Sequence, residues 1–200
     1  MIRYLICLVF IFNVILLLNF IVLPEAKAAA TVPLTVTVNG SLVITDADND
    51  TMLGKDPTKN VTINITPDIG ATTQTGAANF RIRTNRSAWR LTAQKTASNA
   101  GGTGLTDSDV LLDVAKSAGS SANANSGTLV APFNAQTNIG SITTAAAVDV
   151  VSGTAKTSSS KDGTNTNNYF QVNTTYSVVP DFFYSPGTFS TTITYNLVSP

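Results

Sequence analysis

Apolar and polar residues alternate through residues 79–95 of this 200-residue chain. Phe80 and Ile82 alternate with two arginines, and after a short polar break Trp89 and Leu91 alternate with polar residues. A period of two places one set of side chains on a buried face and the other on a solvated face. The stretch therefore predicts a β-hairpin whose buried face carries the only tryptophan of the chain.

Similar short runs recur along the chain, separated by turn signals and polar loops. Asn39-Gly40 is a signal for a tight hairpin turn and predicts that the first two runs pair with each other. No ten-residue window has the pattern of an amphipathic helix. The spacing predicts an all-β protein, an antiparallel β-sandwich of immunoglobulin-like or jelly-roll-like type with about 8 to 11 short strands and long polar loops. Besides the stretch 79–95, the predicted strands are Val32–Val38, Ser41–Thr45, Val61–Thr66, Asp109–Val114, Thr128–Phe133, Ile139–Thr143, Ala145–Ser152, Tyr169–Pro180 and Thr188–Val198.

The first 28 residues differ from the rest. Arg3 precedes an almost wholly apolar run over residues 4–23, and small residues suited to signal peptidase follow it. We expect a secretory signal peptide over residues 1–28 and a single β-sandwich domain over residues 29–200, secreted and free of the membrane after cleavage. The alternative is an uncleaved anchor, because a membrane-spanning helix needs ~20 apolar residues.

The composition of residues 29–200 narrows the function. The twelve basic residues less Arg3 and Lys27 leave ten, and the twelve acidic residues less Glu25 leave eleven. This near-neutral domain is not expected to bind nucleic acid. The chain has no histidine, and its only cysteine and only glutamate lie in residues 1–28. No motif that would activate a serine, threonine or lysine nucleophile is present, so we expect no enzymatic activity.

Two motifs resemble the signatures of the WxL domain of Gram-positive surface proteins. Trp89 and Leu91 match the first Trp-x-Leu, and Tyr195 and Leu197 match the second, with tyrosine in place of its tryptophan. The resemblance implies a β-rich domain held non-covalently on peptidoglycan at the cell surface. It makes these four residues candidates for adhesion to a cell-wall polymer or to other surface proteins. The alternative for Trp89 is a place in the core, because large aromatic side chains dominate core energetics.

Arg81, Arg83 and Arg90 share the solvated face predicted for residues 79–95. Like charges facing each other across strands destabilise a sheet by roughly 0.2–1 kcal/mol, so a counter-charge is expected. An external counter-charge would be an anionic surface polymer such as teichoic acid, and the three arginines would then be binding residues. The internal candidates are Asp46, Asp48, Asp50 and Asp68.

Asp46, Asp48 and Asp50 stand at alternate positions of an acidic loop. Carboxylate oxygens at such spacing suit Ca²⁺. The EF-hand pattern is incomplete, because Thr51 stands at its glycine position and Pro57 at its final glutamate. The sequence thus leaves a calcium site and a solvated acidic loop as alternatives, and it predicts no other cofactor.

Residues 31–38 favour a second class of function. They alternate, carry a proline and would lie at the amino terminus after cleavage, which suits a strand donated to another subunit. The protein would then be a structural subunit of a surface fibre, pilus or extracellular matrix. Against this, Asn39-Gly40 predicts that the strand is held in a hairpin of its own chain.

Overall fold

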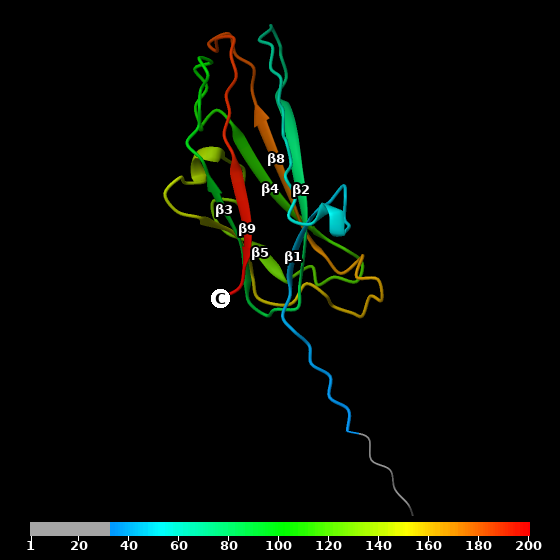
Figure 1. Ribbon diagram of the computed structural model, residues 1–200. Helices are drawn as coiled ribbons and strands as arrows, with labels where there is room; N and C mark the ends of the chain where they lie inside the picture. Colours follow the sequence, from blue (N-terminus) through cyan, green and yellow to red (C-terminus); the bar gives the residue numbers. More distant parts are fainter. Residues whose placement is uncertain (1–32) are drawn as a thin grey trace, which may run out of the picture. The chain divides into compact units, whose positions relative to one another are not determined.

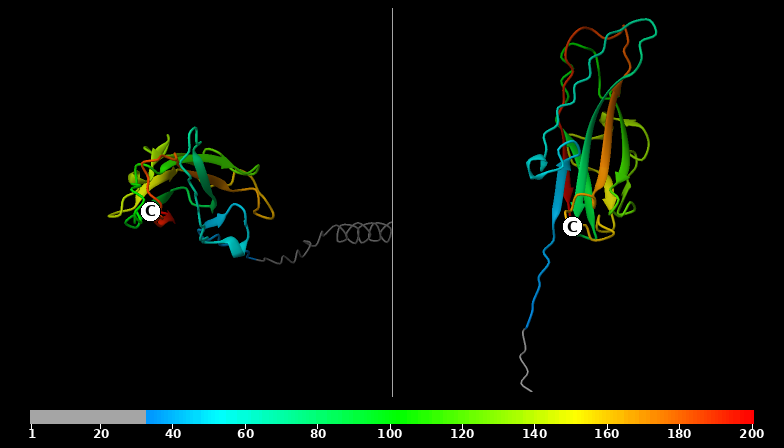
Figure 2. Two further views of the ribbon diagram at one scale, coloured as in Figure 1. Left: turned by 90° about the horizontal axis from the view of Figure 1, so that it is seen from above. Right: turned by 90° about the vertical axis from the view of Figure 1, so that its right-hand side faces the viewer.

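The computed structural model describes residues 33–200, and residues 39–200 form two antiparallel β-sheets that pack face to face (Figure 1). The view from above in Figure 2 shows the strands in two layers. The predicted all-β sandwich is confirmed. The larger sheet has the order β1 (Leu42–Asp46), β2 (Gln74–Thr84), β8 (Phe170–Val178), β4 (Leu111–Ala118) and β6 (Thr137–Asn138). The smaller sheet has the order β5 (Gly127–Leu129), β7 (Val148–Gly153), β3 (Trp89–Lys95) and β9 (Ile193–Val198).

The core lies between the sheets and is filled by alternate residues of the long strands. From Ala78 to the end of β2, and from Phe170 to Tyr176 in β8, every second side chain is buried, as the period of two predicts. Phe80, Ile82, Trp89 and Leu91 all lie in this core. Burying an aliphatic or aromatic side chain of this kind stabilises the fold by about 1.5–3 kcal/mol, so these alternating runs supply much of the driving force for folding.

The hairpin predicted for residues 79–95 does not form, although its buried face is correct. β2 pairs with β1 and β8, whereas β3 pairs with β7 and β9 in the other sheet. The polar break between the two strands carries the chain from one sheet to the other. Both strands therefore turn the same alternating set toward the core but face each other across it, which a period of two alone does not distinguish from pairing side by side.

The hairpin predicted at Asn39-Gly40 is also absent. Residues 33–40 are extended chain outside any strand, and β1 pairs instead with the end of β2, from Leu42 opposite Thr84 to Asp46 opposite Phe80. Asn85 holds this arrangement, because its side chain accepts a hydrogen bond from the backbone of Ser41 at 2.8 Å. Val32 lies outside the described residues.

Two other predicted strands differ. Residues 61–66 are extended and alternate between half-buried and exposed, but they form no strand ladder. Ile139–Ser141 forms the 3-10 turn η2, because the Asn138 side chain accepts from Gly140 N and begins a turn there. A second 3-10 turn, η1, spans Met52–Gly54. The remaining predicted strands are present with shifted ends.

The predicted signal peptide, residues 1–28, lies outside the described residues. Residues 33–38 belong to a separate amino-terminal unit. None of the helical turns in residues 33–200 is long and apolar enough to cross a membrane.

Candidate functional site

Trp89 lies at the centre of the sandwich and is 1% exposed. Its indole lies against the backbones of Gly127 in β5 and Gly153 in β7, where a Cβ atom on either glycine would overlap the ring. Its edge contacts Phe170 of the facing sheet, with ring centroids 5.6 Å apart. Its Nε1 donates to the carbonyl of Ala155 at 2.8 Å. This burial favours the core alternative for Trp89, since no sugar ring can reach the indole.

The other three motif residues meet where β3 pairs with β9. Leu91 stands opposite Leu197 in the ladder and is 0% exposed. Tyr195 and Leu197 are half-buried on β9 and pack against the core. The Tyr195 hydroxyl lies 3.0 Å from that of Tyr176, and burial followed by the interaction with Tyr176 raises the pKa of Tyr195 well above its usual value. Tyr195 therefore links the two sheets through its hydroxyl.

Arg81 and Arg83 converge on Asp50, which lies in the loop after β1. Arg83 donates from Nη1 and Nη2 to the two carboxylate oxygens at 2.7 and 2.6 Å, and Arg81 Nη1 donates at 2.9 Å. The Thr45 hydroxyl donates to the same carboxylate at 2.6 Å. Burial raises the pKa of Asp50, but the hydrogen bonds from Arg83, Thr45 and Arg81 outweigh it and hold that pKa well below its usual range. Asp50 is thus the internal counter-charge of this arginine pair.

Further donors of the same two arginines are also engaged. Arg81 Nε donates to the Gln171 side chain at 3.0 Å, and Arg83 Nε donates to Asn168 at 3.1 Å. The Arg81 guanidinium carbon lies 4.0 Å from the centre of the Tyr169 ring, within the range of a cation–π interaction. The two arginine side chains are 25% and 16% exposed, so little of either is presented to a polymer.

Arg90 differs from the other two arginines. Its side chain is 52% exposed, and its single ion pair, with Asp149 of β7, is 3.4 Å long. An exposed pair of this kind contributes about 0–1 kcal/mol. Of the three arginines proposed to bind an anionic polymer, Arg90 alone keeps most of its surface in solvent.

The acidic loop does not gather its three carboxylates around one point. Asp46 and Asp48 both accept from Lys59 Nζ, at 2.8 and 2.6 Å, while Asp50 faces the arginines. Burial raises the pKa of Asp46, but Lys59 and the backbone of Asp48 lower it to a net value below its usual range. Within residues 33–200 no cluster of three acidic, histidine or cysteine side chains is arranged to hold a metal ion. The geometry favours a loop whose carboxylates are salt partners of Lys59 and of the two arginines, and only Asp48 keeps most of its side chain in solvent.

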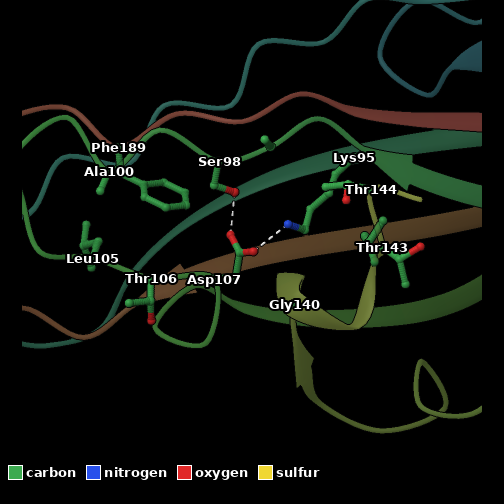
Figure 3. Close-up of a pocket in the computed structure, with 12 residues that line it drawn as sticks. Lys95, Ser98, Ala100, Leu105, Thr106, Asp107, Gly140, Thr143, Thr144 and Phe189 are labelled. Atoms are coloured by element: carbon green, nitrogen blue, oxygen red, sulfur yellow. Dashed lines mark hydrogen bonds and ion pairs between the residues drawn. The ribbon is translucent and has the colours of Figure 1, made fainter. Parts of the chain in front are cut away.

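An open depression of about 530 Å³ lies beyond the end of β3 (Figure 3). Asp107 stands at its centre, where Lys95 Nζ and Ser98 Oγ each donate to one carboxylate oxygen at 2.5 Å. Leu105 and Phe189 line its apolar end. Sequence reasoning missed this group, although one signal was present. Lys95 falls on the same alternating set as Trp89, and a charge on a buried face needs a partner.

The Lys95–Asp107–Ser98 group has the composition of a catalytic site but not its geometry. The Ser98 hydroxyl donates to Asp107, whose pKa is raised by burial but lowered further by hydrogen bonds from Lys95 and Ser98. A carboxylate with a lowered pKa is a weak base, and Lys95 is 8% exposed and points at Asp107 rather than at the serine. A nucleophile needs a base within reach, so this arrangement supports the role of an internal ion pair.

Large apolar side chains are exposed in several parts of the described chain, among them Met52 and Leu53 in η1 and Ile69 in the loop before β2. Leu34, Val36 and Val38 are 84%, 76% and 80% exposed in the amino-terminal segment. Phe182 and Phe183, in the loop between β8 and β9, are 73% and 80% exposed. Exposed apolar groups close together mark interaction surfaces more often than isolated ones do. The alternation of the first group was visible in the sequence, but its exposure was not, because the predicted hairpin would have covered part of it.

The chain matches no known protein family in a comparison with family models, and no curated protein matches it in sequence.

Proposed function

We propose that the chain is a secreted, non-catalytic β-sandwich protein of the bacterial surface that assembles with copies of itself by β-strand exchange. The observation that carries this proposal is the set Leu34, Val36 and Val38, three exposed apolar side chains at alternate positions of an extended segment. Such a segment has the chemistry of a strand that adds to a sheet edge, since it offers backbone groups for a ladder and apolar side chains for one face.

The hairpin that argued against strand exchange is absent. β1 finds its partner in β2 without residues 33–38, so these residues are not needed to complete the larger sheet. Secretion is supported by the charged, apolar and small-residue pattern of residues 1–28. A non-catalytic role is supported by the lack of histidine in the sequence and by the lowered pKa of Asp107, which makes the carboxylate beside Ser98 a weak base.

Non-covalent binding to a cell-wall glycan or anionic polymer is the second candidate, and Arg90 is the observation that favours it. Trp89 and Leu91 are buried, and Arg81 and Arg83 are engaged by Asp50, so the polymer would have to be held mainly by Arg90. Binding through one exposed cation would weaken steeply with salt, because the Debye length is about 8 Å at physiological ionic strength. Retention of the protein on purified cell wall at low salt, lost in Arg90→Ala, is the expected result.

Strand exchange is tested by the size of the secreted protein. Expressed from its full-length gene in a secreting bacterium, the parent is expected to run on size exclusion as a series of assemblies that grow with concentration. Leu34→Asp with Val36→Asp is expected to give monomers, because charges placed on the face that must be buried cost desolvation energy.

The matched control is Thr35→Asp with Thr37→Asp. These substitutions add the same charge to the same segment, on the face that stays in water, and the assemblies are expected to remain. A parent that is monomeric at every concentration would rule out strand exchange, and so would a control that loses its assemblies as fully as the apolar-face variant.

A further inference from the structure

One side of the sandwich is covered by chain that makes no ladder. Residues 57–67 run in extended form beside β2 (cyan in Figure 1), and their residues alternate between half-buried and exposed. No backbone hydrogen bond joins any of these residues to another described residue. Val61, Ile63 and Ile65 pack against the core from this segment. The segment therefore has the side-chain pattern of a strand without the hydrogen bonds of one.

The segment covers part of the inner face of the larger sheet. Val61 and Ile63 occupy the space that a Cβ atom on Gly76 would enter. Gly76 pairs in the ladder with Tyr176 of β8, and the Tyr176 hydroxyl meets that of Tyr195 in β9 at 3.0 Å. Residues 57–67 and β9 therefore cover neighbouring positions of one surface.

The edge of β9 that faces away from β3 has open backbone groups. Thr96 N donates to Thr192 O at 2.9 Å, and an antiparallel ladder turns alternate residues to opposite sides. Since the register is unbroken through β9, its even-numbered residues bond to β3, and the backbone groups of Ile193, Tyr195 and Leu197 face the other side. No strand within residues 33–200 pairs with that side.

The amino-terminal segment has the same pattern of side chains as residues 61–65. Leu34-Thr-Val-Thr-Val38 and Val61-Thr-Ile-Asn-Ile65 both place β-branched or leucine side chains at the first, third and fifth positions and short polar residues between them. We propose that residues 34–38 of one copy replace residues 61–65 of a neighbouring copy and form a ladder with the open edge of its β9. This inference rests on the proposed strand exchange and names its acceptor.

The exchange keeps three apolar side chains packed against the core, as residues 61–65 do, and adds the backbone hydrogen bonds that residues 61–65 lack. Three apolar side chains leave the half-buried positions and three of similar size enter. No backbone hydrogen bond is lost, because residues 61–65 make none with the described chain, whereas the incoming strand can bond to the open groups of β9. The exchange is therefore favoured by the hydrogen bonds of the new ladder.

The other sheet edges fit a donated strand less well. β5 has three residues and β6 has two, too few for a five-residue donor. β1 is already bridged on its outer side, where Thr45 pairs with Lys55 and Asp56 N donates to Ile44 O at 3.0 Å. β9 is open along all six of its residues, whereas β2 and β4 are open only beyond the residues that pair with β1 and β6.

Disulfide trapping between two differently tagged full-length chains tests the acceptor, in a Cys7→Ser background without other cysteines. The donor chain carries Thr35→Cys or Thr37→Cys, and the acceptor chain carries Thr194→Cys or Asn196→Cys. All four combinations are tested so that the register of the new ladder is not assumed. Bands that contain both tags, and that disappear on reduction or when the donor also carries Leu34→Asp with Val36→Asp, are the expected result.

The matched control acceptor is Thr128→Cys, an exposed threonine on β5 at the opposite edge of the same sheet. It is expected to give no band. Assemblies that persist while all four β9 combinations fail, or while Thr128 traps equally well, would overturn the assignment of β9 and leave strand exchange standing. A parent without assemblies would overturn both. A monomeric disulfide within a chain that carries Thr35→Cys and Asn196→Cys would show that the segment closes its own edge.

Discussion

The two sides of the smaller sheet are built from the same alternating pattern, but their side chains are buried to different extents. On the side of β5 and β7, Trp89 is 1% exposed and is held by two glycines, an aromatic ring and a hydrogen bond. On the side of β9, Ile193, Tyr195 and Leu197 are half-buried, and no strand of residues 33–200 pairs with the outer edge of β9. An alternating pattern turns one face of a strand toward the core, but full burial of that face also needs hydrogen-bonded strands on both sides.

This difference assigns the stability of the domain mainly to the side of β5 and β7, and the proposed assembly to the side of β9. The closed side surrounds Trp89 with packed neighbours, so we expect it to contribute to folding. We expect a lower local stability on the open side, because residues 57–67 make no backbone hydrogen bond to the described chain. Regions of a protein that rearrange are drawn from such parts. The following predictions test this contrast, from the largest expected effect on the free energy of unfolding to the smallest.

Trp89→Ala is expected to have the largest effect. Removing a fully buried tryptophan typically costs about 3–5 kcal/mol, a large part of the total stability of a domain. The two glycines beside the indole have no side chains that could fill the cavity. Urea unfolding followed by circular dichroism measures the loss. A variant that unfolds at the same urea concentration as the parent would show that the closed side is not the main source of stability.

Asp50→Asn is expected to cost about 1–3 kcal/mol at neutral pH, because charged hydrogen bonds from Arg81 and Arg83 are lost. The folded pKa of Asp50 lies below its unfolded value, so this stabilisation is present above the unfolded pKa of about 3.9 and is lost as the pH falls below it. The difference between parent and variant should therefore shrink in acid. Asp48→Asn is the control, since the Asp48 side chain is 73% exposed and its loss is expected to cost less than about 1 kcal/mol.

The alternating pattern was enough to predict the sandwich and the buried faces of β2 and β3. It could not predict which strands pair, because the polar break between Thr84 and Trp89 is compatible with a hairpin and with a crossing between sheets. It also could not distinguish residues 61–66, which make no ladder, from true strands, because hydrogen bonding depends on the neighbouring chain and not on the side-chain pattern.

The candidate sites were less predictable, because they depend on contacts between distant parts of the chain. Asp50 was one of four candidate partners for the arginines, and only the fold of its loop brings it to Arg83. Lys95 could have been recognised from its place on the buried set of β3. Its partner Asp107 comes from a loop whose path the sequence does not indicate.

Ile63→Ala measures the covering segment on the open side. Ile63 is half-buried and packs against the core, so its truncation is expected to cost about 1–2 kcal/mol, less than the 2–5 kcal/mol typical of a fully buried isoleucine. If strand exchange replaces this segment, the cost is expected to appear in the monomeric Leu34→Asp, Val36→Asp background and to be smaller in the assembled protein. Urea unfolding of the two forms makes the comparison, with the exposed Thr62→Ala as control.

Leu34→Ser with Val36→Ser is expected to have the smallest effect on the stability of the monomer. Both side chains are more than three-quarters exposed, and substitutions at such positions usually change the free energy of unfolding by less than about 0.5 kcal/mol. The measurement is urea unfolding at a concentration low enough for the parent to be monomeric. A loss comparable to that of Ile63→Ala would mean that the segment packs on its own domain. If the stability of the monomer is unchanged and the variant no longer assembles, these two residues act only in contacts between copies of the chain.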